Sequence, residues 1–222
     1  MKNKRIVFFH PVLYIIILVM ISPIYSILNE STIGAVDVTT RIDDYIPFIK
    51  EFVIPYILWY PFLYGALIYY CFVDRKKYYV ALSSIIFGKL FCFIIYYFWQ
   101  STVPRPEVVG TDIFSQLVLL VYNSDQPVNC LPSIHVLTTF VIMLVVLQRK
   151  GQNKWEYTIG TVMGTLIILS TLFMKQHAIL DVFTGMFVAG AFYIALQFAF
   201  AKVKVYQPKP YKVREVEKTR NF

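Results

Sequence analysis

The sequence predicts an all-α integral membrane protein, a six-transmembrane-helix bundle that forms one domain over residues 1–222. Of these residues 58% are hydrophobic and 18% are aromatic, whereas only 15% are charged. A soluble domain of this size cannot bury so much apolar surface in one core, so lipid must cover part of it. Internal repeats or low-complexity linkers that would divide the chain are absent from the sequence.

Six apolar segments account for the predicted bundle. Five of them, at roughly 17 to 25 residues, are long enough to cross a hydrocarbon core of about 30 Å as helices, and the fourth segment spans only if His135 lies at its rim. The first segment follows basic residues like a secretory signal, but Ile24-Tyr25-Ser26 is a poor cleavage site, so we expect it to stay as a spanning helix. The segments run at 11–28, 52–73, 78–98, 133–148, 155–174 and 178–201.

Basic residues predict the orientation. Most of the 21 Lys and Arg lie before residue 6, at 74–77, at 149–154 and after residue 201. By the positive-inside rule both termini are then cytoplasmic, and the 29–51 and 99–132 loops face outward. The net charge of +8 also includes a basic cytoplasmic tail at 203–222, which either contacts anionic lipid or remains solvated. Because the other basic residues are scattered over short turns, we expect no nucleic-acid partner.

The outer loop between the third and fourth predicted spans contains a further short helix. Asp112 precedes an apolar run over 113–122 and is a suitable helix cap. A helix of about ten residues is too short to span, so it is expected to lie at the membrane interface. Turn-forming residues then lead to Pro132, which we expect in the first turn of the next helix.

Two of the three histidines lie at outer helix ends. His135 follows Ser133, where free N–H groups at a helix start attract phosphate oxygens. His177 precedes Asp181 by one helical turn, so that the carboxylate can hold the imidazole. An aspartate within a membrane segment is costly and usually functional. The alternatives are a helix-capping serine beside an interfacial histidine, and a buried polar pair that only joins two helices.

Other reactive residues have simpler interpretations. Lys89 lies within a predicted span, deeper than Phe98 and on the opposite helical face, which favours an interhelical or snorkelling group. Cys71 and Cys92 lie in apolar segments and Cys130 is alone in an outer loop. No structural disulfide, metal site or cofactor is therefore expected.

Three ordered pieces of sequence carry a resemblance to a known family. They are Arg105-Pro106, then Pro132-Ser133-Ile134-His135, then Ser170 followed by His177 and Asp181. Together, over roughly 98–185, they resemble the signature of the type 2 phosphatidic acid phosphatase superfamily. The resemblance implies that His177 forms a phosphohistidine, that Asp181 orients it, and that His135 protonates the leaving oxygen. It further implies that Arg105 and Ser133 hold the phosphate.

Two positions depart from the family pattern. Phe98 and Thr171 stand where the family has Lys and Arg, which removes two cationic phosphate ligands and makes Lys175 a candidate replacement. The Cys130–His135 segment and Ser170-Thr171 look more like the inositol phosphorylceramide synthase branch, which transfers head groups between lipids. A transferred phosphodiester has less charge to neutralise than a phosphate monoester.

The expected function is therefore a lipid phosphate phosphatase, multi-pass in the plasma membrane, with its site on the extracytoplasmic face. Its expected partners are a lipid phosphate substrate and membrane lipid. The sequence does not identify a protein partner. A lipid head-group phosphotransferase is the first alternative. A helical membrane protein that keeps the fold without chemistry is the second. The sequence does not distinguish acyl from prenyl lipid chains.

Overall fold

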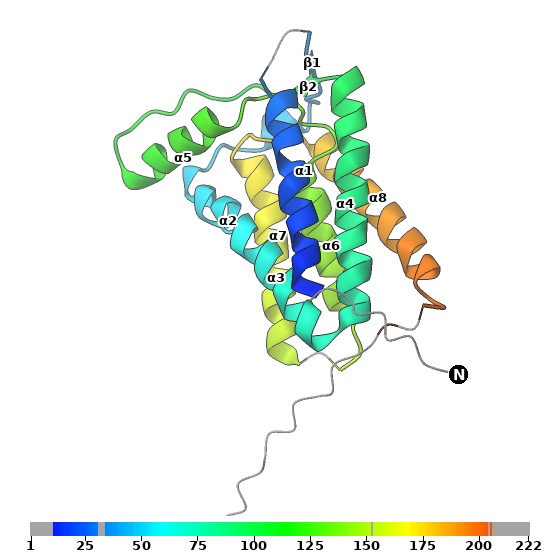
Figure 1. The fold of residues 1–222 in the computed structure, drawn as a ribbon. Coiled ribbons are helices and arrows are strands. Elements are labelled where there is room, and N and C mark those ends of the chain that lie inside the picture. Colours follow the sequence, from blue (N-terminus) through cyan, green and yellow to red (C-terminus); the bar gives the residue numbers. More distant parts are fainter. Residues whose placement is uncertain (1–10, 31–33, 152, 204, 206–222) are drawn as a thin grey trace, which may run out of the picture.

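The fold is a helical bundle with a small pair of strands at one end (Figure 1). The computed structural model describes residues 11–30, 34–151, 153–203 and 205. The α-helices are α1 (Ile15–Leu28), α2 (Val53–Ile57), α3 (Trp59–Val73), α4 (Arg75–Phe98), α5 (Ile113–Ser124), α6 (Ile134–Gln148), α7 (Lys154–Phe173) and α8 (Ile179–Ala199). Short 3₁₀ helices lie at Pro11–Tyr14, Asp43–Tyr45 and Lys50–Phe52.

Within the described residues, four helical segments are long and apolar enough to cross a membrane, namely Lys50–Val73, Arg75–Phe98, Lys154–Phe173 and Ile179–Ala199. The first of these contains α2 and α3. Helices α1, α5 and α6 are apolar but shorter. The membrane-type helical fold is therefore as expected, whereas the count of six spans and the cytoplasmic termini remain predictions. Nearly all of the 203–222 tail lies outside the described residues.

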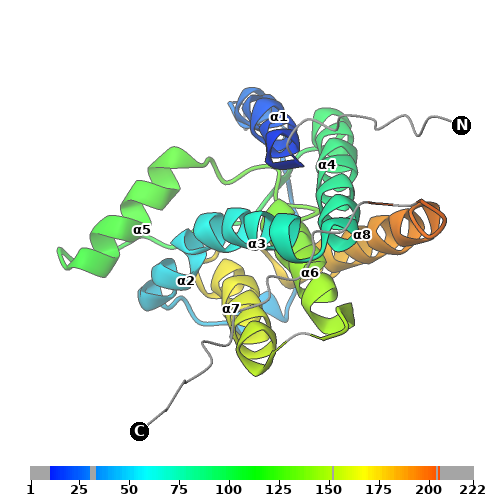
Figure 2. The same cartoon turned by 60° about the horizontal axis from the view of Figure 1, so that its bottom comes forward.

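Helix α6 is the centre of the bundle. It contacts α3, α4, α7 and α8, which lie around it in the view of Figure 2. Fully buried tyrosines contribute to the packing of these helices, among them Tyr70, Tyr78, Tyr96 and Tyr193. Helix α1 packs on α4 at the outside of the bundle. The residues at the start of α6 are thus enclosed by helices from distant parts of the sequence.

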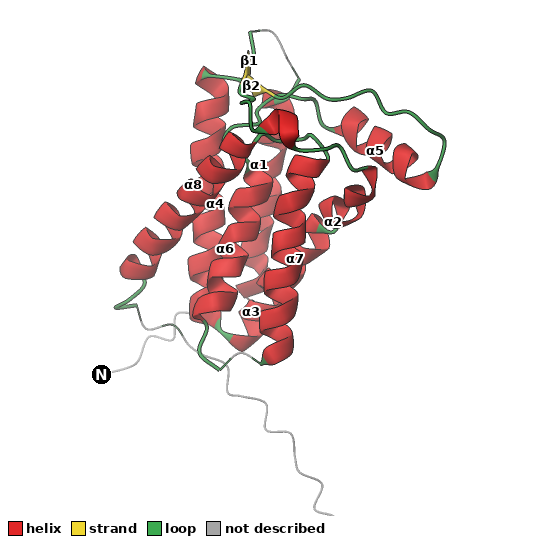
Figure 3. Cartoon of the chain, turned by 180° about the vertical axis from the view of Figure 1, so that it is seen from behind, coloured by secondary structure: helices red, strands yellow, loops and turns green. Residues whose placement is uncertain are grey.

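The candidate residues gather at one end of the bundle, which we call the site end. Figure 3 shows that α6 and α8 begin there and that α4 and α7 end there. Arg75, the first residue of α4, and Arg149, just after α6, lie at the opposite end. This alternation matches the grouping of loops that the charge pattern predicts.

A short strand pair at the site end was not part of the all-α prediction. Strand β1 (Val36–Asp37) pairs in parallel with β2 (Ser101–Thr102). Strands of two residues are too short to show the alternation of apolar and polar residues by which strands are predicted. The pairing nevertheless supplies partners for backbone groups where two long loops meet.

Helix α5 lies across the site end, outside the bundle (Figure 1). It begins as predicted, because the Asp112 carboxylate accepts hydrogen bonds from the N–H groups of Phe114 and Ser115. The same carboxylate lies 2.5 Å from the Lys50 amine, and this hydrogen bond lowers the pKa of Asp112. The helix continues to Ser124, two residues beyond the predicted range.

The predicted start of the next helix was wrong by two residues. Pro132 lies before α6, after a cis peptide bond from Leu131. Ser133 is the N-cap, and its hydroxyl accepts the N–H of Val136 at 3.3 Å. A serine oxygen can accept such an N–H group, whereas a proline side chain cannot, so the helix boundary follows Ser133. The Pro132 carbonyl instead accepts the hydroxyl of Tyr96.

The first turns of α6 and α8 lie against each other. The backbone N–H of Ser133 donates to the carbonyl of Asp181 at 3.2 Å. One turn further along α8, a β-carbon on Gly185 would lie 2.8 Å from the Ser133 carbonyl oxygen. The absence of a side chain at Gly185 therefore permits the close approach of the two helix ends.

We predict that Gly185→Ala separates these helix ends. The added methyl group meets backbone, which cannot move aside as a flexible side chain can, so a loss of about 1 to 3 kcal/mol in unfolding free energy is expected. Thermal unfolding in detergent measures it. Gly190→Ala on the same helix is the control, since its β-carbon would have no neighbour within 4 Å. Equal melting temperatures for the two variants would contradict the prediction.

Candidate active site

His177 is positioned by the turn that ends α7. Lys175 adopts a positive φ of 51°, and its N–H donates to the Leu172 carbonyl at 3.0 Å. The N–H of Gln176 donates to the Thr171 carbonyl at 3.0 Å, which completes a Schellman motif. The N–H of His177 reaches the same carbonyl at 3.1 Å. The backbone of His177 is therefore held by the end of α7 rather than by α8.

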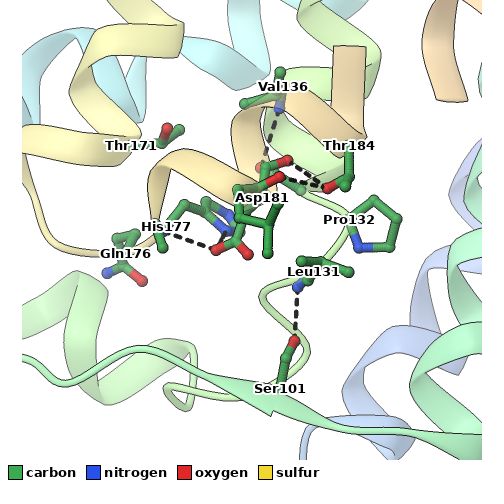
Figure 4. Close-up of polar contacts among 12 residues, drawn as sticks. Ser101, Leu131, Pro132, Val136, Thr171, Gln176, His177, Asp181 and Thr184 are labelled. Carbon is green, nitrogen blue, oxygen red and sulfur yellow. Dashed lines mark hydrogen bonds and ion pairs between the residues drawn. The ribbon is translucent and has the colours of Figure 1, made fainter. Parts of the chain in front are cut away.

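His177 and Asp181 form a buried pair (Figure 4). Nδ1 of His177 lies 3.3 Å from Oδ2 of Asp181, and the side chains are 8% and 0% exposed. A carboxylate only accepts, so the proton of the neutral ring belongs on Nδ1 and Nε2 is left free. Oδ2 also accepts the N–H of Ala178 at 2.8 Å, in the first turn of α8. These two contacts fix the direction of the imidazole.

His135 lies across from His177, with 5.7 Å between the ring centroids. Its ring packs against Tyr56 at 4.8 Å and Trp59 at 4.2 Å, both from the second predicted span. The indole N–H of Trp59 donates to the Thr138 hydroxyl at 2.8 Å, which ties α3 to α6. Two aromatic rings thus hold His135 against the side of the site.

Arg105 reaches the site end from the loop before α5. Its Nη1 donates to the carbonyls of Tyr122 and Asp125 at 3.1 and 2.7 Å, and its Nη2 donates to Oε1 of Gln176 at 2.5 Å. The guanidinium also lies over the Tyr122 ring at 4.5 Å. Its buried Nε has no hydrogen-bond partner among the described residues. One donor of Arg105 thus remains available to a ligand.

Gln176 was missed by the sequence analysis. It is 3% exposed, and while Oε1 accepts from Arg105, the amide Nε2 has no partner within the described part of the chain. A buried donor without a partner is costly, which makes the Gln176 amide a candidate ligand-binding group. Its place next to His177 in the sequence was the available signal, but nothing in the sequence shows that Arg105 lies beside it.

The remaining predicted ligands differ in position. Ser133 is fully buried between α6 and α8 and caps α6. The Lys175 amine donates to the carbonyl of Asp43 at 2.8 Å, so in this structure it is directed toward the 38–46 segment. At Phe98 and Thr171, the two positions that depart from the family pattern, neither side chain replaces the missing cationic phosphate ligand. Phe98 is 79% exposed, and the hydroxyl of Thr171 donates within α7 to Ile168.

Cys130 is the third group beside the pair. One ligand atom each from Cys130, His177 and Asp181 lie within 4.8 Å of one another, which the sequence spacing did not indicate. Thiolate, imidazole and carboxylate are ligands that suit Zn²⁺. Burial raises the pKa of the Cys130 thiol well above its usual range, and Asp181 adds to the shift. A raised pKa disfavours the thiolate, which is the nucleophilic form of cysteine, so Cys130 is a weaker candidate nucleophile than His177.

A cavity of about 1030 Å³ opens beside His135. Its walls come from α1, α3 and α5 and include Leu18, Trp59, Tyr60, Leu63 and Leu120. At its rim the hydroxyl of Tyr25 donates to the Asp125 carboxylate at 2.8 Å, while burial raises the pKa of Asp125. Polar groups thus gather at the site end, and the deeper lining is mostly apolar apart from Lys89 and Ser22, an arrangement that suits a lipid with a polar head.

Comparisons with known proteins agree with the sequence motifs. The family model of the PAP2 superfamily matches residues 77–204, more than half of the chain. The chain is also 29% identical over 123 residues to an uncharacterized protein of Methanocaldococcus jannaschii. The match covers 54% of this chain and 49% of the relative, so the chain spans about half the length of that curated protein. No solved structure matches the chain.

We predict that Lys175→Gly distinguishes two roles of Lys175, its backbone role in the turn after α7 and the role of its amine as a phosphate ligand. Glycine adopts a positive φ without the steric cost of a β-carbon, so the unfolding free energy should stay level or rise by up to about 1 kcal/mol. The melting temperature in detergent measures this change. If the amine leaves Asp43 to bind phosphate, inhibition by inorganic phosphate should weaken about tenfold or more. Lys175→Ala is the control, since it also removes the amine but keeps the β-carbon. Unchanged inhibition in both variants would show that the amine is no phosphate ligand.

Proposed function

The chain belongs to the PAP2 superfamily, whose members are generally phosphatases or phosphotransferases, and from this we propose that it is a membrane lipid phosphate phosphatase. The observation that carries the proposal is the buried His177–Asp181 pair facing His135 at the rim of an apolar cavity. The proposal places this site on the extracytoplasmic face of the plasma membrane, as the charge pattern predicts.

In the first step the Nε2 atom of His177 attacks the phosphorus of the lipid phosphate. A phosphorus–nitrogen bond forms while the bond from phosphorus to the lipid oxygen breaks. Asp181 keeps the Nδ1 proton in place and stabilises the positive charge that develops on the ring. The negative charge of the bound phosphate favours the protonated form of His135, which then gives its proton to the leaving oxygen, so the lipid departs as an alcohol.

In the second step water attacks the phosphohistidine. His135, now neutral, takes a proton from the water as the phosphorus–nitrogen bond breaks. Inorganic phosphate leaves, and His177 and His135 return to their starting protonation states. The short distance between the two rings supports this exchange of proton and phosphoryl group within one site.

The phosphate oxygens are held by donors from three segments. In the proposal Arg105 uses its unpaired Nε, while Ser133 and the N–H groups at the start of α6 contribute from the helix end. The free amide of Gln176 supplies a further donor next to His177. Lys175 joins these ligands only when its amine exchanges the Asp43 carbonyl for phosphate.

A lipid head-group phosphotransferase is the second candidate. The exposed ring of Phe98 and the inward hydroxyl of Thr171 leave Arg105 with little cationic support, which favours a phosphodiester over a doubly charged monoester. Release of inorganic phosphate from lipid phosphates, measured beside transfer of a labelled head group to an alcohol, distinguishes the two reactions. Transfer without release of phosphate would favour this second candidate.

We predict that His177→Ala abolishes turnover and the acid-labile phosphoenzyme, because no other side chain can replace the nucleophile. Asp181→Asn should lower turnover by about 10³ to 10⁴ fold, as for other orienting acids. Trapping of labelled phosphoenzyme and steady-state turnover measure both effects. The matched control is His10→Ala, at the third histidine, which lies outside the described residues. A loss below about tenfold for Asp181→Asn would mean that the pair is structural.

His135 should matter most for poor leaving groups. A general acid lowers the barrier only when the leaving oxygen needs a proton in the transition state. We therefore predict that His135→Ala retains more activity on an aryl phosphate than on a lipid phosphate, with kcat/KM as the measurement. Equal losses on both substrates would indicate phosphate binding or folding instead of proton transfer.

A further inference from the structure

Lys89 of α4 is a buried cation inside a predicted span. Its side chain is 7% exposed, and its amine lies 3.2 Å from the hydroxyl of Ser22 on α1 and 5.7 Å from the Phe93 ring centroid. The interhelical role expected from the sequence is thus present. However, Lys89 has no carboxylate within 4.0 Å in the described part of the chain.

The sequence also suggested that Lys89 lies away from the site, but it lines the same cavity as His135. Ser22 and Tyr25 of α1 and Tyr60 and Tyr64 of α3 line this cavity too. An ammonium group carries three donors, and the Ser22 hydroxyl accepts one of them. The remaining donors border a space that a substrate would fill.

The depth of Lys89 limits what it can contact. It precedes Tyr96 by seven residues, about 10 Å along the helix, and the Tyr96 hydroxyl meets the Pro132 carbonyl beside the start of α6. The amine lies over Phe93, one turn nearer the site end, so it reaches toward the phosphate site. It therefore lies below the phosphate, at the level of the groups that join a lipid head to its chains.

A hydrocarbon chain at this depth would strip water from the ammonium group and offer no acceptor, which is costly. An ester or amide carbonyl at the same depth would accept a charged hydrogen bond, which contributes more than a neutral one. Acyl lipids carry such carbonyls a few bonds from the phosphate. Prenyl phosphates carry only hydrocarbon there.

We propose that Lys89 is a specificity-determining residue that donates hydrogen bonds to the carbonyl oxygens of an acyl lipid phosphate. The cavity then selects acyl lipid phosphates over prenyl phosphates. This inference rests on the proposed function only in taking a lipid phosphate as the ligand of the site. It concerns recognition, and it holds equally for hydrolysis and for transfer.

The test measures binding, so that it does not depend on turnover. The full chain with His177→Ala is titrated in detergent with dioleoyl phosphatidate and with its dioleyl ether analogue, which has the same phosphate and chain length but lacks both carbonyls. We expect the ester to bind about tenfold or more tightly than the ether. Adding Lys89→Met should remove this difference by weakening ester binding alone. Lys76→Met, the same substitution on the same helix at its opposite end, should leave the difference intact.

Equal binding of ester and ether by the parent protein would overturn the inference, and it requires no Lys89 variant. So would a preference for the ester that survives Lys89→Met, or tighter binding of farnesyl phosphate than of dioleoyl phosphatidate. If Lys89→Met is unstable, Ser22→Ala, which keeps the ammonium group, should retain the ester preference. The wild-type protein could also show neither phosphate release nor head-group transfer while binding still shows an ester preference that depends on Lys89. That result would refute the proposed function and leave this inference standing.

Discussion

The hydrogen bond from the Ser133 N–H to the Asp181 carbonyl is the contact on which the site depends. It joins the first turns of α6 and α8, and each turn carries or adjoins one of the two histidines. Since α6 is central, the bond also fixes α8 relative to α3, α4 and α7. The absence of a side chain at Gly185 is the steric condition for this contact.

The site and the cavity divide recognition between polar and apolar groups. Tyr56 and Trp59 contact the His135 ring and also line the cavity, so they form the wall between the two histidines and the apolar part of the cavity. Above this wall lie buried donors with unfilled hydrogen-bonding capacity, such as Nε of Arg105. Below it, apolar and aromatic side chains prevail. This separation orients an amphipathic molecule before any chemistry occurs.

Features that depend on neighbours in the sequence were predictable. The Asp112 cap and the His177–Asp181 contact each span one helical turn, so residue type and spacing suffice to indicate them. Features that join distant segments were not. Gln176 meets Arg105 across 71 positions, and no pattern in either segment records that contact. The ends of the spans were only partly predictable. Hydropathy locates the apolar segments, but the helix ends follow local capping, as at Ser133.

The tie between α6 and α8 is made by backbone atoms, so it requires the missing side chain at Gly185 but not the side chains that carry the chemistry. Substitutions among the reactive residues can therefore accumulate without moving the two helix ends apart. Phe98 and Thr171 are uncharged where the resemblance leads one to expect Lys and Arg, and the imidazoles nevertheless face each other. A protein engineer could exchange the residues around the two imidazoles while keeping the same pair of helix ends.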